Sequence, residues 1–384
     1  MRFEFATAAR IVFGQGAVAD LGSLARPFGK RVFVVTGKDR IRRAGIVADL
    51  EGAGFTCSLF GVSGEPTVAL VREGAELLRA AGPHAVIAIG GGSVIDAAKA
   101  IAALAPNPGD VLEYLEVVGQ GKPLPHAPTP LIAVPTTAGT GSEVTRNAVL
   151  GSPEHGVKAS LRSPLMLPRI ALVDPELTLG LPRGITASTG LDALTQLIEP
   201  FVCSRANPLT DAFCRDGISM AFRSLPRACA NGRDAQARFG MSYASLLGGL
   251  SLANAGLGVV HGFAAPVGGM FPAPHGAVCA ALLPHGMEAN IRALRARAPE
   301  SLSLDRYTEI ARMLTGNAAA TAEEGAAKVG ELVRELGIPG LRTYGVGDED
   351  VALLAQKAGQ ASSMKANPIS LTREELEGVV SAAL

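Results

Sequence analysis

Apolar positions in the first half of the chain follow two alternating patterns. Short continuous apolar runs, several rich in β-branched side chains, recur at residues 10–17, 31–37, 55–62, 85–93, 131–137 and 170–178. Between them, residues 45–54 and 68–82 space their apolar side chains as amphipathic helices do. Buried strands separated by helices predict an α/β fold with a mostly parallel sheet covered on both faces.

The pattern changes at about residue 183. Helical spacing dominates from there, as in GLDALTQLIEPFVC (190–203), and no strong strand pattern follows. We therefore predict a dinucleotide-binding α/β domain at residues 1–182 and an all-α domain at residues 183–384. Small-molecule sites usually lie where domains meet, so we expect the active site in a cleft between the two.

Composition narrows the classes of partner. The chain has 384 residues, 48% of them hydrophobic, and 35 basic residues balance 35 acidic ones, which argues against a broad face for nucleic acid or an anionic membrane. No apolar run approaches the ~20 residues that span a bilayer. Five cysteines without C-x-x-C spacing are typical of a reducing compartment. We expect a cytoplasmic protein with neither a membrane nor a nucleic-acid partner.

A glycine-rich turn follows the apolar run at residues 85–93. Gly90, Gly91 and Gly92 precede Ser93 and a helix that carries Asp96 near its start. Because glycine has no Cβ, backbone N–H groups can approach an anion there, and the helix N-terminus adds a favourable dipole. The turn is not G-x-G-x-x-G, so a tight turn that binds nothing is the alternative.

A second loop, AVPTTAGTGSEVT (133–145), follows another apolar run and is rich in hydroxyl groups. Thr136, Thr137, Thr140, Ser142 and Thr145 lie among small residues, which suits a pyrophosphate and a ribose. A solvated Ser/Thr loop is the alternative. Two such loops on one edge of a sheet favour a nucleotide.

Polar residues on the predicted helix at 190–203 raise a further question. Asp192 and Gln196 are four residues apart, so their side chains lie on one helical face. That face is either a solvated polar stripe or a carboxylate and an amide oxygen directed at a metal ion.

Two histidines downstream offer more ligands. His261 and His275 would be ~21 Å apart on one straight helix. Gly268-Gly269, Pro272 and Pro274 should break that helix and let the chain fold back. Asp192, Gln196 and the two imidazoles would then form a mixed oxygen and nitrogen site for Fe²⁺ or Zn²⁺. The alternative is that each histidine is an ordinary core residue.

Together these stretches resemble the iron-containing (group III) alcohol dehydrogenase family, whose members have a dehydroquinate synthase-like fold. The matching pieces are GGGSVIDAAKA, PTTAGTGSEVT, Lys158 in GVKASL, VDPELT, STGLDAL, VVHGFAAPVGG, APHGAVCA and LLPH. The resemblance implies NAD(P)-dependent interconversion of an alcohol and an aldehyde or ketone.

The resemblance also implies roles for individual residues. The cofactor would be held by Gly37, Gly90, Gly91, Gly92, Ser93, Asp96, Thr136, Thr137, Thr140, Thr145 and Lys158. The family's metal ligands are one Asp and three His, and Asp192, His261 and His275 fill three of these positions and are the implied catalytic residues. Gln196 occupies the fourth position, and Ala265 stands where relatives often have another His.

Gln196 leaves three functions open. If an ion is retained, as we favour, Gln196 is a weak ligand or contacts the other ligands, because an amide oxygen is a poorer donor than imidazole. If the ion is lost, the protein is a metal-independent reductase of an oxo or unsaturated acid, as in maleylacetate reductases. A nucleotide-binding protein without catalysis is the third possibility.

The cofactor preference depends on the end of the strand at residues 31–37. Relatives specific for NAD commonly have an acidic residue there, where this chain has Gly37, and cations follow at Lys38, Arg40, Arg42 and Arg43. We predict that NADP(H) is accepted at least as well as NAD(H), although Asp39 and a merely solvated basic turn weigh against it. The N-terminal segment is expected to pair with a second subunit, giving a homodimer.

Overall fold

The computed structural model describes residues 2–37 and 40–384, which separate into two compact units. The α/β unit comprises Ala6–Thr137 and Gly141–Leu179. The helical unit comprises Met1–Phe5, Ala138–Thr140 and Gly180–Leu384.

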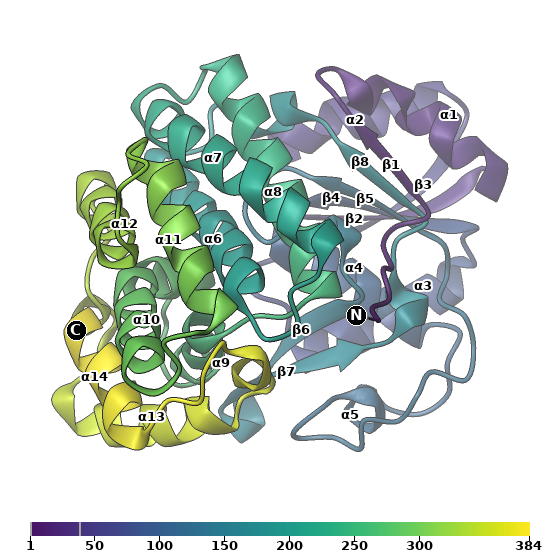
Figure 1. The fold of residues 1–384 in the computed structure, drawn as a ribbon. Coiled ribbons are helices and arrows are strands. Elements are labelled where there is room, and N and C mark those ends of the chain that lie inside the picture. Colours follow the sequence, from purple (N-terminus) through teal and green to yellow (C-terminus); the bar gives the residue numbers. More distant parts are fainter. Residues whose placement is uncertain (1, 38–39) are drawn as a thin grey trace. The chain divides into compact units, whose positions relative to one another are not determined.

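A six-stranded parallel sheet forms the centre of the α/β unit (Figure 1). Its strand order is β1-β8-β5-β4-β2-β3. This arrangement confirms the predicted α/β class and its parallel sheet. The strands are β1 (Arg10–Phe13), β8 (Ile170–Val173), β5 (Leu131–Pro135), β4 (Ala85–Gly90), β2 (Arg31–Gly37) and β3 (Thr56–Val62).

Helices cover both faces of this sheet, which explains why its central strands are continuously apolar. Phe33 and Val35 of β2 enter one core together with residues of α3 (Val68–Ala81) and α4 (Gly92–Leu104). Val32 and Val34 point the opposite way, into a second core that includes residues of α1 (Leu21–Ala25) and α2 (Arg40–Gly52). A short helix, α5, covers Val111–Tyr114.

The α/β unit also contains an antiparallel hairpin that the apolar pattern did not predict. Its strands are β6 (Asn147–Ser152) and β7 (Val157–Arg162), and the turn between them ends at Gly156, whose φ is 61°. Buried positions alternate with exposed or half-buried ones along both strands, so neither contains a continuous apolar run.

The helical unit is built around α6 (Arg183–Val202), which packs against α7, α8 and α10 (Figure 1). Every residue of α6 from Gly190 to Val202 is buried. Polar side chains on this stretch must therefore find partners inside the unit. The other helices are α7 (Pro208–Ala230), α8 (Ala235–Asn254), α9 (Val259–Met270), α10 (His275–Arg297), α11 (Leu302–Thr315), α12 (Ala322–Leu336), α13 (Val351–Gln360) and α14 (Arg373–Ala383).

As predicted, the chain folds back between the two histidines, although the break lies later than expected. Gly268 and Gly269 remain inside α9, and the helix ends only at Met270. The four residues that follow include Pro272 and Pro274, and α10 starts directly after the second proline. The prolines therefore account for the break, because proline lacks the N–H that would continue a helix.

No single helix within the described ranges is long and apolar enough to cross a membrane. The bent pair α8 and α9, which meet at 96°, satisfies that test only by length and composition.

Candidate functional site

Four potential metal-ligand atoms converge in the helical unit. They come from Asp192 on α6, His261 on α9, and His275 and Cys279 on α10, and all lie within 4.8 Å of one another. Asp192 Oδ1 is 3.5 Å from His261 Nε2 and 3.7 Å from His275 Nε2. The Cys279 Sγ atom is 3.7 Å from His275 Nε2. The structure thus brings together three of the four predicted ligands and adds a thiol.

Local sequence explains how α9 and α10 present these groups. His261 is the third residue of α9, and His275 is the first residue of α10 because Pro274 precedes it. Cys279 follows His275 by four residues, so both side chains lie on one helical face.

Two atoms of the cluster, which lie 3.5 Å from each other, lack hydrogen-bond partners, and they test whether the cluster suits a metal ion. In the part of the chain that the structure describes, Asp192 Oδ1 and His261 Nε2 are buried and accept or donate no hydrogen bond. Leaving such a group unpaired costs about 1–3 kcal/mol, so buried polar atoms usually have a partner. Both atoms face the centre of the cluster, where a cation would satisfy them.

The distances between ligand atoms in the cluster also fit a bound metal ion. Around a tetrahedral ion with bonds of about 2.0–2.3 Å, neighbouring ligand atoms are about 3.3–3.8 Å apart. The three separations given above, 3.5, 3.7 and 3.7 Å, are close to those edges. The donor set therefore fits a divalent ion.

Negative charge in the cluster governs the protonation of its imidazoles. Burial opposes a charge on His261, but Cys279, Asp192 and Glu199 outweigh it and hold the His261 pKa well above its usual value. Cys279, followed by Asp192, overcomes burial to raise the pKa of His275 to about 9. Burial raises the pKa of Asp192, but the two histidines prevail and the pKa is lowered. The cluster thus favours positive charge. A divalent ion would supply that charge and would displace the protons from the imidazole nitrogens that it binds.

Glu199 orients His261, a role that the sequence analysis missed. His261 Nδ1 donates to Glu199 Oε2 at 2.6 Å, and the Val260 N–H donates to Oε1 at 2.7 Å. A proton held on Nδ1 leaves Nε2 as the lone-pair atom that a metal needs. The available signal was spacing, because Glu199 follows Asp192 by seven residues, about two helical turns.

Gln196 makes one contact through its amide nitrogen, and the predicted role of its oxygen as a weak metal ligand stays a prediction. Its side chain is buried, and Nε2 donates to the carbonyl oxygen of Gly139 at 3.1 Å. Gly139 belongs to the hydroxyl-rich loop and packs so closely on Thr189 that a Cβ would lie 2.9 Å from Thr189 Cβ. Gln196 therefore attaches the segment Ala138–Thr140 to α6.

The two predicted cofactor loops lie side by side in the α/β unit. Strands β4 and β5 are parallel neighbours, and the Thr136 N–H donates to the Gly90 carbonyl at 3.0 Å. A Cβ on Gly90 would lie 2.5 Å from Val94, and one on Gly91 would lie 3.2 Å from Thr137 Oγ1. Only glycine fits at Gly90 without displacing its neighbours.

A buried polar network ties α4 to the second loop. The Asp96 carboxylate accepts hydrogen bonds from the Ser142 hydroxyl and from the Val149 N–H. Lys99 Nζ, which the sequence analysis overlooked, donates to Ser142 Oγ at 3.0 Å and to Thr145 Oγ1 at 2.8 Å. Burial lowers the pKa of Lys99 to about 8. Asp96 and Thr145 therefore shape the loop, and a direct contact to a cofactor remains a prediction.

The remaining predicted cofactor residues are dispersed along the α/β unit, except for Thr140, which belongs to the helical unit. Gly92 and Ser93 form the first turn of α4, Gly37 ends β2, and Thr140 is half-buried. Lys158 on β7 lies 2.5 Å from the Glu65 carboxylate. Lys38 and Asp39 lie outside the described residues, as do the side chains of Arg40, Arg42 and Arg43.

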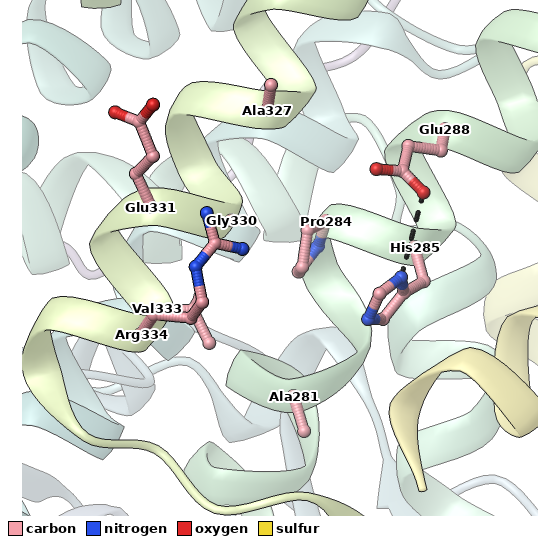
Figure 2. A pocket seen from close by; sticks show the side chains of 9 residues that line it. All are labelled: Ala281, Pro284, His285, Glu288, Ala327, Gly330, Glu331, Val333 and Arg334. Atoms are coloured by element: carbon pink, nitrogen blue, oxygen red, sulfur yellow. Dashed lines mark ion pairs between the residues drawn. The ribbon is translucent and has the colours of Figure 1, made fainter.

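The helical unit has a separate hollow of about 260 Å³ between α10 and α12, shown in Figure 2. His285 and Glu288 line one side of it, and Glu331 and Arg334 belong to the other. His285 is ten residues after His275 on α10, about 15 Å along the axis, so the hollow is distinct from the ligand cluster. Two carboxylates, one guanidinium and one imidazole line it, and its described residues form no convergence of ligands comparable to the cluster.

Comparison with known families agrees with this geometry. Residues 8–175 match the model for iron-containing alcohol dehydrogenase, and residues 186–384 match the C-terminal model of the same family. The chain belongs to the iron-containing alcohol dehydrogenase family, as its motifs indicated. It is therefore an oxidoreductase of the NAD-dependent class that interconverts alcohols and aldehydes.

Individual relatives cover nearly the whole chain. Alcohol dehydrogenase 4 of Schizosaccharomyces pombe is 36% identical over 97% of this chain and 87% of its own length. The NAD-dependent methanol dehydrogenase of Bacillus methanolicus is 33% identical over 97% of both chains. A solved structure of 1,3-propanediol oxidoreductase superposes with a TM-score of 0.92 at 33% identity, covering both chains completely.

Proposed function

We propose that this protein transfers a hydride between a nicotinamide cofactor and a small alcohol or aldehyde, with a divalent ion held by Asp192, His261 and His275. The observation that carries the proposal is the pair of buried atoms without partners, Asp192 Oδ1 and His261 Nε2. A metal-independent reductase would have no use for that pair, since two apolar groups would be less costly there.

Each residue has a distinct task in this proposal. A bound ion supplies Lewis acidity that polarises a carbonyl or lowers the pKa of an alcohol. Asp192 contributes negative charge, and His261 is held in one tautomer by Glu199. The side chain of His275 is 37% exposed, so this ligand is accessible from outside the core. Ala265 cannot relay a proton, so we assign that step to water or to a ribose hydroxyl of the cofactor.

The cofactor preference follows from the end of β2. Gly37 has no carboxylate to repel a 2′-phosphate. We therefore propose that NADP(H) is used at least as well as NAD(H). A kcat/KM for NADH more than about tenfold above that for NADPH, ~1.4 kcal/mol, would contradict this.

The N-terminal segment, which contains β1, suggests a homodimer. β1 is an edge strand of the sheet and pairs only with β8 within the described part of the chain. Open strand edges are ready templates for pairing with a second copy.

The experiment is a substrate screen on purified protein. Short alcohols, aldehydes and oxo acids are tested with both cofactors, after exhaustive chelation and after reloading with Fe²⁺ or Zn²⁺. We expect aldehyde reduction that chelation abolishes and reloading restores. Undiminished reduction of an oxo acid after chelation would favour the metal-independent reductase, and no turnover at all would favour a binding protein.

A further inference from the structure

We propose that the Cys279 thiolate is the fourth protein ligand of the metal site and replaces the imidazole that the family motif places at position 196. The inference rests on the metal site of the proposed function and specifies its chemistry. It begins from the position of one buried thiol.

Cys279 is placed as a ligand should be. It is fully buried and lies one helical turn after His275, with Sγ 3.7 Å from His275 Nε2. Around a tetrahedral ion, a sulfur and a nitrogen ligand are about 3.5 Å apart. A buried cysteine alone is ordinary packing, but here two unpartnered atoms, Asp192 Oδ1 and His261 Nε2, face the same point.

Gln196 is the weaker candidate for this ligand. Its amide nitrogen donates to the Gly139 carbonyl, and its remaining donor atom, Oε1, is a poorer ligand than a thiolate for late first-row ions. The ligand that α6 lacks at this position is thus offered by α10 from another direction.

The balance of charge supports a thiolate in place of the imidazole. One Asp and three His leave a divalent ion with a net charge of +1, whereas Asp192 and a Cys279 thiolate neutralise it. The cluster lies mostly in the core, where Asp192, His261 and Cys279 are at most 7% exposed. Because an uncompensated buried charge is costly, the neutral set suits this location.

A thiolate in place of an imidazole also changes the ion that the site prefers. Thiolates are soft ligands that select Zn²⁺, whereas oxygen and nitrogen ligands accept a wider range of first-row ions. Nitrogen and oxygen sites already bind Zn²⁺ more tightly than Fe²⁺, so we expect the Zn²⁺-to-Fe²⁺ affinity ratio to be at least tenfold higher in wild type than in Cys279→Ser.

The test uses cobalt as a spectroscopic probe in the full-length protein. Chelated protein is reloaded with Co²⁺, and the spectrum is compared among wild type, Cys279→Ser, Gln196→Ala and Cys57→Ser. Cys57 lies on β3 in the α/β unit and serves as the matched control. We expect a near-ultraviolet thiolate-to-cobalt charge-transfer band in all but Cys279→Ser, which should also bind Zn²⁺ at least tenfold more weakly.

The possible failures can be told apart. Visible d–d bands without a charge-transfer band in wild type would overturn the cysteine ligand and leave metal-assisted hydride transfer intact. If no ion binds, the cysteine proposal and the metal role both fail, and the activity of the same preparation decides whether hydride transfer stands.

A variant that misfolds does not block the test. X-ray absorption of the wild-type zinc protein would then decide, since one sulfur at about 2.3 Å supports the proposal and a shell of only nitrogen and oxygen overturns it.

Discussion

His261 and Glu199 form a buried hydrogen bond of 2.6 Å, in which the imidazole Nδ1 donates to the carboxylate Oε2. The other carboxylate oxygen accepts the Val260 N–H at 2.7 Å. Both oxygens therefore act as acceptors, and when the imidazole is neutral its proton lies on Nδ1, which leaves the Nε2 lone pair for a metal. A ligand of this kind depends on its partner for its tautomer.

Replacing Glu199 with glutamine should weaken the metal site. An amide has only one acceptor oxygen, so its NH₂ group must face either the Val260 N–H or His261 Nδ1. The second arrangement pushes the imidazole proton onto Nε2, where it blocks coordination. We expect Glu199→Gln to bind Zn²⁺ about 10–100-fold more weakly, as measured by competition with a chromophoric chelator.

Glu309→Gln is the control for that measurement. Glu309 pairs with Arg215 on the surface of the helical unit and lies outside the ligand cluster. Wild-type affinity in Glu199→Gln would show that Glu199 does not set the tautomer of His261.

Removing the Gln196 side chain should reduce stability without removing the metal. In Gln196→Ala the Gly139 carbonyl loses its partner, which costs about 1–3 kcal/mol of unfolding free energy. Urea titration should show that loss, while metal analysis should still find one ion per chain. Thr195→Ala is the control, since the Thr195 hydroxyl donates only to Leu191 in its own helix. Loss of the ion from Gln196→Ala would instead make Gln196 a ligand.

Strands buried on both faces were predictable from the sequence, whereas the hairpin was not. The runs that became β2, β4 and β5 are apolar at nearly every position because helices cover both sides of the sheet. β6 and β7 alternate, and short alternating segments with glycine and lysine do not stand out from loops.

The sequence could predict only part of the ligand cluster. Pro272 and Pro274 indicated that His261 and His275 could approach each other, and the helices do fold back there. Spacing alone could also have placed Cys279 on the helical face of His275, and Glu199 on that of Asp192. It could not show which faces of α6, α9 and α10 meet, because that depends on tertiary packing.

The cofactor preference can be reversed at the end of β2. Among the residues that the structure describes, a Cβ on Gly37 would have only Val94 Cγ2 within 4 Å, at 3.8 Å, so these residues leave room for Gly37→Asp. The added carboxylate should repel a 2′-phosphate and shift the NADPH-to-NADH ratio of kcat/KM at least about tenfold toward NADH, ~1.4 kcal/mol.

Gly61→Asp is the matched control for cofactor preference. It adds the same charge on the neighbouring strand β3, at a position where a Cβ would meet nothing within 4 Å. An unchanged ratio in Gly37→Asp would mean that Gly37 does not face the ribose.

Glu143 should give the α/β unit a pH-dependent stability. Its side chain is buried, and burial raises its pKa to about 7, against 4.5 as the ordinary value. A pKa raised by folding favours the protonated form in the native state. Its stabilising contribution is therefore complete below pH 4.5 and is lost as the pH rises through 7.

The expected loss of unfolding free energy can be measured by comparing wild type with Glu143→Gln, whose side chain cannot ionise. Over pH 4.5 to 7 the unfolding free energy of wild type should fall relative to the variant by up to about 3 kcal/mol. Lys99 titrates at higher pH, because burial lowers its pKa from 10.5 only to about 8. Its contribution to stability recovers as the pH rises from 8 to 10.5. Denaturant titrations at half-unit pH intervals check this difference. Parallel curves for wild type and variant between pH 4.5 and 7 would mean that Glu143 ionises as easily in the native state as in the unfolded chain.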